Sequence, residues 1–320
     1  MRTHRHAAID ILFIRTFIIK RIDMKKTIFA LALLLAMTAQ AQNDTIGVSK
    51  FTAIYQYCCK TTNAAGEPIT DSLLIAVQTA NGVTKSFPYN SYNKQTKKKT
   101  DSYYTQKAAQ MHMGDVFLNY PEGRITVQEE LYPSLYQTDE PLQKPKWNLS
   151  EQEDSIFGYQ CRAAEAKYRG KNWKAYYTEE VPASIGPWKL GGLPGMITKV
   201  EDEEGIHSFT LCGLLNEEQP LIFTEYLNWF VPQMNSGKMS MARQRIDYQK
   251  MTAKKFLKHK KKVLGNPRYV QNPTYYAPSA MEAFGYREHH LSNLSDQQII
   301  SVAGVVVLSE GHAYQPLEIE

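Results

Sequence analysis

Alternation between hydrophobic and polar residues runs through the first two thirds of the chain and predicts β-strands. β-Branched and aromatic residues alternate with polar ones, or form short apolar runs, at 51–57, 73–78, 83–87, 115–120 and 124–128. Asn81-Gly82 and Pro121-Glu122-Gly123 supply turn residues between neighbouring segments. This part of the chain is therefore expected to form short strands joined by tight turns.

Four further strands with short connections are predicted in the middle of the chain, at 159–168, 173–178, 196–200 and 207–215. Residues 169–172 form a four-residue hairpin loop in this prediction, and the acidic residues at 201–205 form a second turn. Acidic residues at a turn are most simply solvated, so they do not indicate a metal site. The short connections indicate an antiparallel meander.

A long helix is predicted at 240–264, where helix-forming residues dominate. One face of it carries Met241, Tyr248, Met251, Phe256 and Val263. Gly265 and the Asn266-Pro267 pair end the helix, and the lysines of its last turns suit the negative end of the helix dipole. Contact with a membrane or a nucleic acid is the alternative role for these lysines.

The predicted fold is mainly β (α+β): a curved antiparallel sheet with the helix at 240–264 packed on it. Residues 265–295 are rich in Tyr, Pro and Asn and are expected to be irregular, whereas 298–309 offers one more apolar strand. By analogy with periplasmic lipoprotein carriers, the sheet could form a half-open barrel. A single domain over 42–320 is long enough to bury roughly three quarters of its unfolded surface.

The N-terminal segment carries the pattern of a secretory signal peptide at 24–41. Two lysines precede an apolar run, and Ala39-Gln40-Ala41 forms a cleavage signal. The predicted cut lies between Ala41 and Gln42, which makes the mature chain periplasmic or secreted. The apolar run is too short for a lasting span of a bilayer, so no stable membrane span is expected after cleavage. Residues 1–23 are expected to be an over-extended gene start, with a two-part leader as the alternative.

Removing the leader changes the charge of the chain. The sequence has 37 Lys and Arg against 32 Asp and Glu, but residues 1–41 hold seven of the basic and two of the acidic residues. The remaining 279 residues therefore carry 30 basic and 30 acidic side chains. This balance gives no basis for a nucleic-acid partner.

All four cysteines, Cys58, Cys59, Cys161 and Cys212, lie in the exported part and are candidates for disulfides. Four cysteines permit three connectivities, and a bond between the adjacent Cys58 and Cys59 would be strained. Buried thiols are the alternative for at least two of them. Their spacing does not match a zinc site.

The densest turn chemistry lies in the stretch GPWKLGGLPGMITKVED at 186–202. Pro194 suits the second position of a turn, and Gly195 is expected to take the positive φ that a type II turn requires next. The glycines before them give freedom, or leave room where another segment passes closely. The alternative is a ligand- or partner-facing edge with apolar surface beside bare backbone. Its candidate binding residues are Trp188, Gly191, Gly192, Leu193, Pro194 and Gly195.

No catalytic motif emerges from the sequence. The chain contains no GxSxG, HExxH or P-loop, and no GxGxxG that opens a helix. Cys161 lies in the middle of a predicted strand, where an inward-facing thiol is expected. The adjacent Glu179 and Glu180 would point to opposite faces of a strand, so they could not act as an acid/base pair. Enzymatic activity is therefore the less favoured interpretation, and no cofactor is predicted.

Met111, His112 and Met113 form the one cluster of soft ligands, which would suit copper. Two methionines separated by one residue are more often simply one face of a strand. His289 and His290 could also supply ligands, but a pair in a surface loop is the usual case. No metal is therefore predicted.

The run GYQCRAAEAKYRGKNWKAYYTEEVPASIGPWKLGGLPGMI at 158–197 resembles the signature region of the GLPGLI family, exported proteins of Bacteroidota without a characterised function. The likeness extends through 73–87, 114–125 and 145–161, and so covers most of 51–215. Met196 stands where the family's name has Leu, which is a volume-conserving change. The resemblance implies an exported protein of that lineage and offers no catalytic residues to carry over.

Three functions are consistent with these observations. The first is a non-enzymatic ligand-binding or carrier module of the periplasm or envelope, which holds an apolar small molecule in the concave face of the sheet; strand content and 36 aromatic residues support it. The second is an interaction module that docks on an outer-membrane or envelope protein through 188–195. The third is a hydrolase whose catalytic residues converge without a local motif.

Overall fold

The computed structural model of the protein describes residues 45–63, 65–89, 113–131, 134–235, 238–264 and 313–319. The chain divides into two units, Met1–Thr45 and Ile46–Glu320, and the fold below is that of the second unit. Several predicted segments lie outside the described residues: the gene start at 1–23, the signal peptide at 24–41, the irregular segment at 265–295 and the strand at 298–309.

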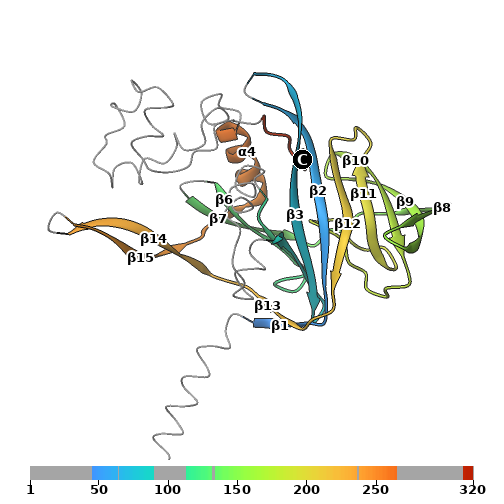
Figure 1. Cartoon of the computed structure of the whole chain (residues 1–320), viewed down its shortest axis with the longest axis horizontal. Coiled ribbons are helices and arrows are strands. Elements are labelled where there is room, and N and C mark those ends of the chain that lie inside the picture. The colour runs from blue at the N-terminus through green and yellow to red at the C-terminus, as the bar shows by residue number, and fades with distance from the viewer. Residues whose placement is uncertain are drawn as a thin grey trace, which may run out of the picture. The chain divides into compact units, whose positions relative to one another are not determined.

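Strands make up most of the described elements (Figure 1). Their bounds are β1 (Thr45–Ser49), β2 (Thr52–Thr62), β3 (Pro68–Ala80), β4 (Val83–Pro88), β5 (Asp115–Leu118), β6 (Arg124–Leu131), β7 (Ser134–Pro141), β8 (Asn148–Ile156), β9 (Tyr159–Tyr168), β10 (Lys171–Thr178), β11 (Met196–Asp202), β12 (His207–Leu215), β13 (Gln219–Ile222), β14 (Tyr226–Asn235), β15 (Lys238–Asp247) and β16 (Gln249–Thr252), followed by the helix α4 (Ala253–Leu264).

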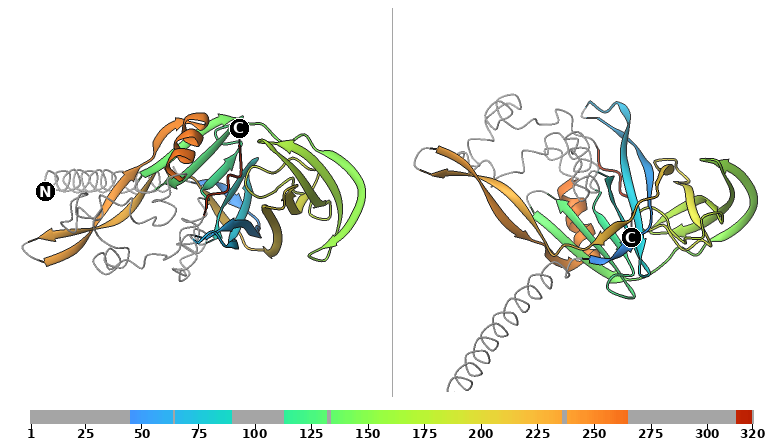
Figure 2. Two further views of the ribbon diagram at one scale, coloured as in Figure 1. Left: turned by 90° about the horizontal axis from the view of Figure 1, so that it is seen from above. Right: turned by 60° about the horizontal axis from the view of Figure 1, so that its bottom comes forward.

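One large sheet contains twelve of these strands, in the order β16-β7-β6-β5-β4-β3-β2-β12-β11-β10-β9-β8. Its neighbours are antiparallel except for β16 and β7, which run parallel, and the two end strands do not pair with each other. The strands bend as they cross the sheet, which is clearest for β8 and β9 in Figure 2. The prediction of a mainly β fold with a curved, largely antiparallel sheet and one helix is confirmed, and the sheet is not closed into a barrel.

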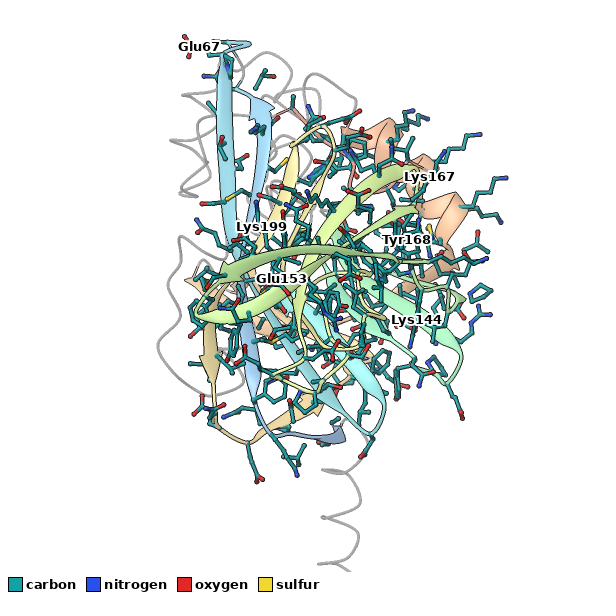
Figure 3. All side chains as sticks on the ribbon, turned by 90° about the vertical axis from the view of Figure 1, so that its right-hand side faces the viewer. Glu67, Lys144, Glu153, Lys167, Tyr168 and Lys199 are labelled. Carbon is teal, nitrogen blue, oxygen red and sulfur yellow. The ribbon has the colours of Figure 1, made fainter. Side chains whose placement is uncertain are left out.

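β8 forms the outer edge at one end of this sheet. Eight of its nine residues are exposed, and Figure 3 labels one of them, Glu153. Its sequence, NLSEQEDSI, places Glu151, Glu153 and Asp154 on this edge. β8 therefore contributes almost nothing to the core and presents acidic side chains to solvent.

β9, β10, β11 and β12 are neighbours in the sheet and form the predicted meander. The connection between β9 and β10 is shorter than predicted, because Tyr168 pairs with Lys171 and only Arg169 and Gly170 lie between them. Both residues take positive φ, 55° and 80°, which is the type I′ geometry that matches the twist of paired strands. The predicted turn at Asn81-Gly82 has the same geometry, with φ of 51° and 76°.

The helix is shorter than predicted, because α4 begins at Ala253 rather than at residue 240. Residues 238–247 instead form β15, which pairs along its whole length with β14, and 249–252 form β16. The sequence analysis did not identify β14, so it provided no strand partner for 240–247. Helix propensity is a weak preference, and a continuous ladder of backbone hydrogen bonds overrides it.

α4 packs on the β16 end of the large sheet. Phe256 and Leu264 form a small core with Leu131 and Tyr136, and the Tyr136 and Phe256 ring centroids lie 5.3 Å apart. Lys260 is also buried, and its ammonium lies 2.6 Å from the carboxylate of Glu129 on β6. The buried ammonium of Lys260 and the buried carboxylate of Glu129 each need the other as a partner. This pairing fixes the position of α4 on the sheet.

The main hydrophobic core is built by inward-facing residues of β2, β3 and the meander. Tyr55, Trp173, Tyr177 and Phe209 are among its largest fully buried side chains. The hydroxyl of Tyr55 donates to the carbonyl of Ile197 at 2.6 Å, which satisfies a polar group that would otherwise be costly to bury. The core therefore couples β2 to β11 across the sheet.

The C-terminal segment at 313–319 is tied to strands that lie far from it in the sequence. The backbone N–H of Ala313 donates to the carbonyl of Thr62 at 2.9 Å, and that of Ile319 donates to the carbonyl of Arg169 at 3.1 Å. Between these two points, the Nε2–H of His207 donates to the carbonyl of Pro316 at 3.1 Å. The segment thus joins the end of β2, the start of β12 and the β9–β10 turn.

Glu318 of this segment completes a cluster of four largely buried charges. The Lys189 ammonium lies 2.8 Å from Glu318 and 2.9 Å from Glu140. Arg169 lies 2.8 Å from Glu140 and 3.5 Å from Glu318. Burial disfavours the charged form of Glu140, but Lys189 and Arg169 outweigh it and hold the pKa of this carboxyl below its usual range. Two cations and two carboxylates balance one another.

His207 has no exposed surface. Burial lowers the pKa of its imidazole to about 4, although the nearby Asp202 opposes the shift. A carbonyl can only accept a hydrogen bond, so Nε2 carries the proton that reaches Pro316. Nδ1 then accepts from the hydroxyl of Tyr57 at 2.9 Å. The neutral ring therefore satisfies a partner on each side.

We expect Glu318→Gln to lower the free energy of unfolding by about 2 kcal/mol or more, since it leaves the buried Lys189 without one of its two carboxylates. Glu204→Gln is the matched control: this carboxylate is 67% exposed and 3.5 Å from Lys171, so its loss should cost less than about 0.5 kcal/mol. Urea unfolding of both variants measures the difference, and equal losses would contradict the structural role of the cluster.

We expect the free energy of unfolding to decrease as the pH is lowered, because His207 becomes protonated. Its folded pKa lies below the unfolded value of about 6.5, so the unfolded chain binds the proton first. The stability from the neutral ring is complete above pH 6.5 and is lost as the pH falls toward about 4.

His207→Gln should remove this component, which amounts to roughly 3 kcal/mol between about pH 7 and pH 4. Urea unfolding of the wild type and the variant at both pH values isolates it from the titration of carboxylates. NMR titration of the wild-type imidazole is the direct check, and a midpoint near the unfolded value would overturn the assignment.

Candidate functional site

The glycine- and proline-rich segment that the sequence singles out forms the loop between β10 and β11. Short-range backbone hydrogen bonds shape it, from Ala183 to the carbonyl of Val181 and from Leu190 to that of Pro187. The N–H of Ile197 also donates to the carbonyl of Ile185 at 3.0 Å. The loop is therefore folded back on its own start rather than extended into solvent.

The apolar side chains of this loop are anchors in the main core. Trp188 is 5% exposed and Leu193 is 1% exposed. Trp188 has a φ of 55°, and its N–H donates to the hydroxyl of Ser86 at 2.9 Å. The hypothesis that Trp188 and Leu193 present apolar surface to a partner is wrong, because burial in the core removes both side chains from the surface.

Gly195 is required for space rather than for a left-handed backbone. Its φ is not positive, so the predicted type II turn at Pro194-Gly195 is wrong. A Cβ at Gly195 would lie 1.9 Å from the carbonyl oxygen of Thr178, where the chain enters β11 beside the end of β10. Gly192 is the residue in the left-handed region, with a φ of 94°. The close approach considered as an alternative in the sequence analysis therefore explains Gly195.

An open pocket of about 560 Å³ lies beside this loop. Three stretches of chain line it: the turn region of β3, β4 and β5, the segment after β7, and the β10–β11 loop. The lining residues are Thr79, Gly82, Thr84, Leu118, Asn119, Leu142, Gln143, Lys144, Pro182, Ala183, Ser184, Ile185, Gly186, Lys189, Gly191 and Gly192.

Hydrogen bonds between distant segments hold the walls of the pocket in place. The indole N–H of Trp147 donates to the carbonyl of Gly191 at 3.0 Å, and the hydroxyl of Tyr168 donates to the carbonyl of Gln143 at 2.9 Å. On the opposite wall, the amide of Asn119 donates to the carbonyl of Gly82 at 3.2 Å. The pocket is therefore pre-formed by the fold.

The lining combines apolar walls with hydrogen-bonding groups. Leu118, Leu142 and Ile185 provide apolar surface, and Asn119 and Ser184 are among the polar side chains. None of the lining residues is Asp, Glu, His or Cys. These four residue types supply most general bases and activated nucleophiles, and lysine is a further possible base. The ionisable side chains of this lining are therefore lysines alone.

The structure separates the other sequence-predicted candidates from this pocket. Among the six proposed binding residues, only Gly191 and Gly192 line it, while Pro194 is exposed outside it. Met113 packs against the main core; Met111, His112 and the His289-His290 pair lie outside the described residues, so copper binding stays an untested hypothesis. Within the described ranges, no group of three His, Cys, Asp or Glu could hold a metal ion.

All four cysteines are free thiols in the structure. Cys161 is buried, and its sulfur lies 3.1 Å from the hydroxyl of Thr198. Cys58 pairs in register with Ser208, four residues before Cys212 on β12, a separation of roughly 13 Å along a strand. A disulfide needs Cα atoms within about 7 Å, so Cys58 and Cys212 cannot bond to each other in this fold.

Glu179 and Glu180 have separate structural partners. Glu179 forms an exposed ion pair with Arg162, and the carboxylate of Glu180 accepts from the backbone N–H of Gln160 at 2.9 Å. Both residues lie just after the end of β10 rather than on a strand, and their carboxylates contact different partners. Residues that the sequence analysis missed, such as Lys144 and Asn119, carry no local motif, and the pocket brings them together from distant segments.

Comparisons with known proteins add little to this picture. No protein-family model and no curated protein matches the chain. Two solved structures of PNGF-II match it. The structure in space group P21 has a TM-score of 0.41 and 14% identity, and the match covers 67% of this chain and 33% of that chain. The structure in space group C2 has a TM-score of 0.37 and 13% identity, and the match covers 64% of this chain and 32% of that chain. The chain thus spans about a third of their length. At this level of similarity the match supports no argument about function.

In the described part of the chain, no helical residues form a segment long and apolar enough to cross a bilayer.

We expect Gly195→Ala to destabilise the protein by about 2 kcal/mol, because the new methyl group would overlap the Thr178 carbonyl and force the β10–β11 junction apart. Gly191→Ala is the matched control in the same loop: its nearest neighbour would be Leu118 at 3.8 Å, so the change should stay within about 1 kcal/mol. Urea unfolding compares the two variants. An unchanged stability for Gly195→Ala would contradict the close approach.

Proposed function

We propose that the protein is an exported, non-enzymatic ligand-binding or carrier module of the periplasm or envelope. The observation that carries this proposal is the pre-formed pocket of about 560 Å³ beside the β10–β11 loop. Its volume is in the range of small-molecule sites, and its mixture of apolar walls and a few polar groups is typical of them. The ligand site is thus an open pocket beside the loop.

The sequence supports the cellular part of the proposal. The signal-peptide pattern at 24–41 and the resemblance to the GLPGLI family both indicate an exported protein. The lining holds no Asp, Glu, His or Cys, and this favours binding over hydrolysis. Burial of Trp188 and Leu193 removes the apolar edge on which the docking alternative depends. Ligand binding is therefore the function that these observations favour.

We expect the protein exported from its own host to carry a small molecule. Native mass spectrometry should give a mass above that of a chain starting at Gln42, and the extra mass should leave on denaturation. A bare native mass under gentle conditions would contradict the carrier role. A chain that keeps residues 1–41 in the envelope fraction would contradict export through a cleaved signal.

Ser184→Trp should abolish the bound mass, because Ser184 is an exposed residue of the pocket lining and an indole there would fill the space. Ser155→Trp is the matched control, since Ser155 is exposed on β8 and lies outside the lining. Both variants should keep the melting temperature of the wild type within a few degrees. Equal ligand retention in the two variants would place the site elsewhere.

A further inference from the structure

We infer that the pocket selects amphiphilic ligands with an anionic head group, which Lys144 recognises at the mouth. This inference rests on the proposed function and specifies its ligand class. Among the lining residues, the ionisable side chains are Lys144 and Lys189, and none is a carboxylate. The charge that the lining presents is therefore positive or zero.

Lys189 does not supply a free charge to a ligand. Its side chain is 2% exposed, and its ammonium is shared between the carboxylates of Glu140 and Glu318. Arg169 compensates the remaining charge of the same two carboxylates. The cluster is therefore neutral as a whole, and the net charge of the pocket comes from Lys144.

Lys144 is placed to use its charge on a ligand. It is exposed, and no carboxylate among the described residues pairs with it. The stem of the side chain lies over the loop: its Cδ would be 3.3 Å from a Cβ at Gly192 and its Cβ 3.5 Å from the same point. Glycine at this position lets the stem settle on the backbone, as long basic side chains do when they keep the head in water. Figure 3 labels Lys144 and Tyr168. The Tyr168 hydroxyl donates to the carbonyl of Gln143, the residue before Lys144.

Two backbone donors belong to residues of the same lining, Gly191 and Gly192. Within the described part of the chain, the N–H groups of Gly191 and Gly192 donate to no acceptor. Successive N–H groups around a residue with positive φ favour anions. Gly192 has such a φ, 94°. An anionic head group beside Lys144 would satisfy these donors.

Apolar side chains of the lining favour a short hydrocarbon tail on the same ligand. Leu118, Leu142 and Ile185 all contribute to the pocket. Burying a methylene group stabilises a complex by about 0.8 kcal/mol. The chemistry shared by carboxylate and phosphate amphiphiles, a negative head on an apolar tail, thus matches this site.

Isothermal titration of the mature protein, freed of bound ligand, tests this selectivity with octanoate, octyl phosphate and 1-octanol. We expect at least one anionic probe to bind about fivefold more tightly than the alcohol of the same chain length, as one solvent-accessible charge pair allows. The two anionic probes distinguish a carboxylate head from a phosphate head. Added salt should reduce the preference, because it screens an exposed charge.

Lys144→Gln should abolish the preference for the anionic probes and leave the affinity for 1-octanol unchanged. Lys146→Gln is the matched control: this lysine is also exposed, but it does not line the pocket. It should keep the preference of the wild type. Both changes are at exposed positions, so both variants should fold.

Equal affinities for all three probes, or a preference that survives Lys144→Gln, would overturn the inference and leave the pocket as a ligand site. Failure of all three probes to bind would overturn it as well. In that case the native mass of the exported protein decides separately whether the proposed function stands, because a bound molecule of another class would still be detected.

Discussion

Four charges that water cannot fully solvate connect parts of the chain that are distant in the sequence. Lys189 belongs to the β10–β11 loop, Arg169 to the β9–β10 turn, Glu140 to β7 and Glu318 to the C-terminal segment. Each ion depends on the others, since a lone buried charge is strongly unfavourable. The cluster thus fixes the β10–β11 loop and the end of the chain relative to β7 and the β9–β10 turn, which lie near opposite ends of the large sheet.

The candidate site follows from this arrangement and from two kinds of anchor in the same loop. Trp188 and Leu193 hold the loop in the core, while Gly186 and Gly195 allow it to run against neighbouring carbonyl groups that any side chain would meet. The rest of the loop is thereby left at the surface beside the segment after β7. The pocket therefore exists because tight packing holds the β10–β11 loop in this position beside the segment after β7.

Sequence patterns could predict β2 to β6 and β9 to β12, because alternation reports directly which face of a strand is buried. They failed at β15, where helix-forming residues pair with a strand that the analysis missed, and at Gly195, where the constraint comes from Thr178 across the sheet. The candidate site was only partly predictable: Gly191 and Gly192 lie in a recognisable motif, whereas Lys144, Asn119 and the lining of β3–β5 meet them only in the folded chain. Contacts of this kind leave no periodicity to detect.

An open sheet has free edges, and β8 occupies one of them. The unpaired backbone groups of an edge strand can recruit a strand from another molecule and start aggregation. Glu151, Glu153 and Asp154 lie along this exposed strand, so a second copy docking there would bring like charges together. The acidic composition of β8 thus disfavours the pairing of this open edge with the same edge of a second copy.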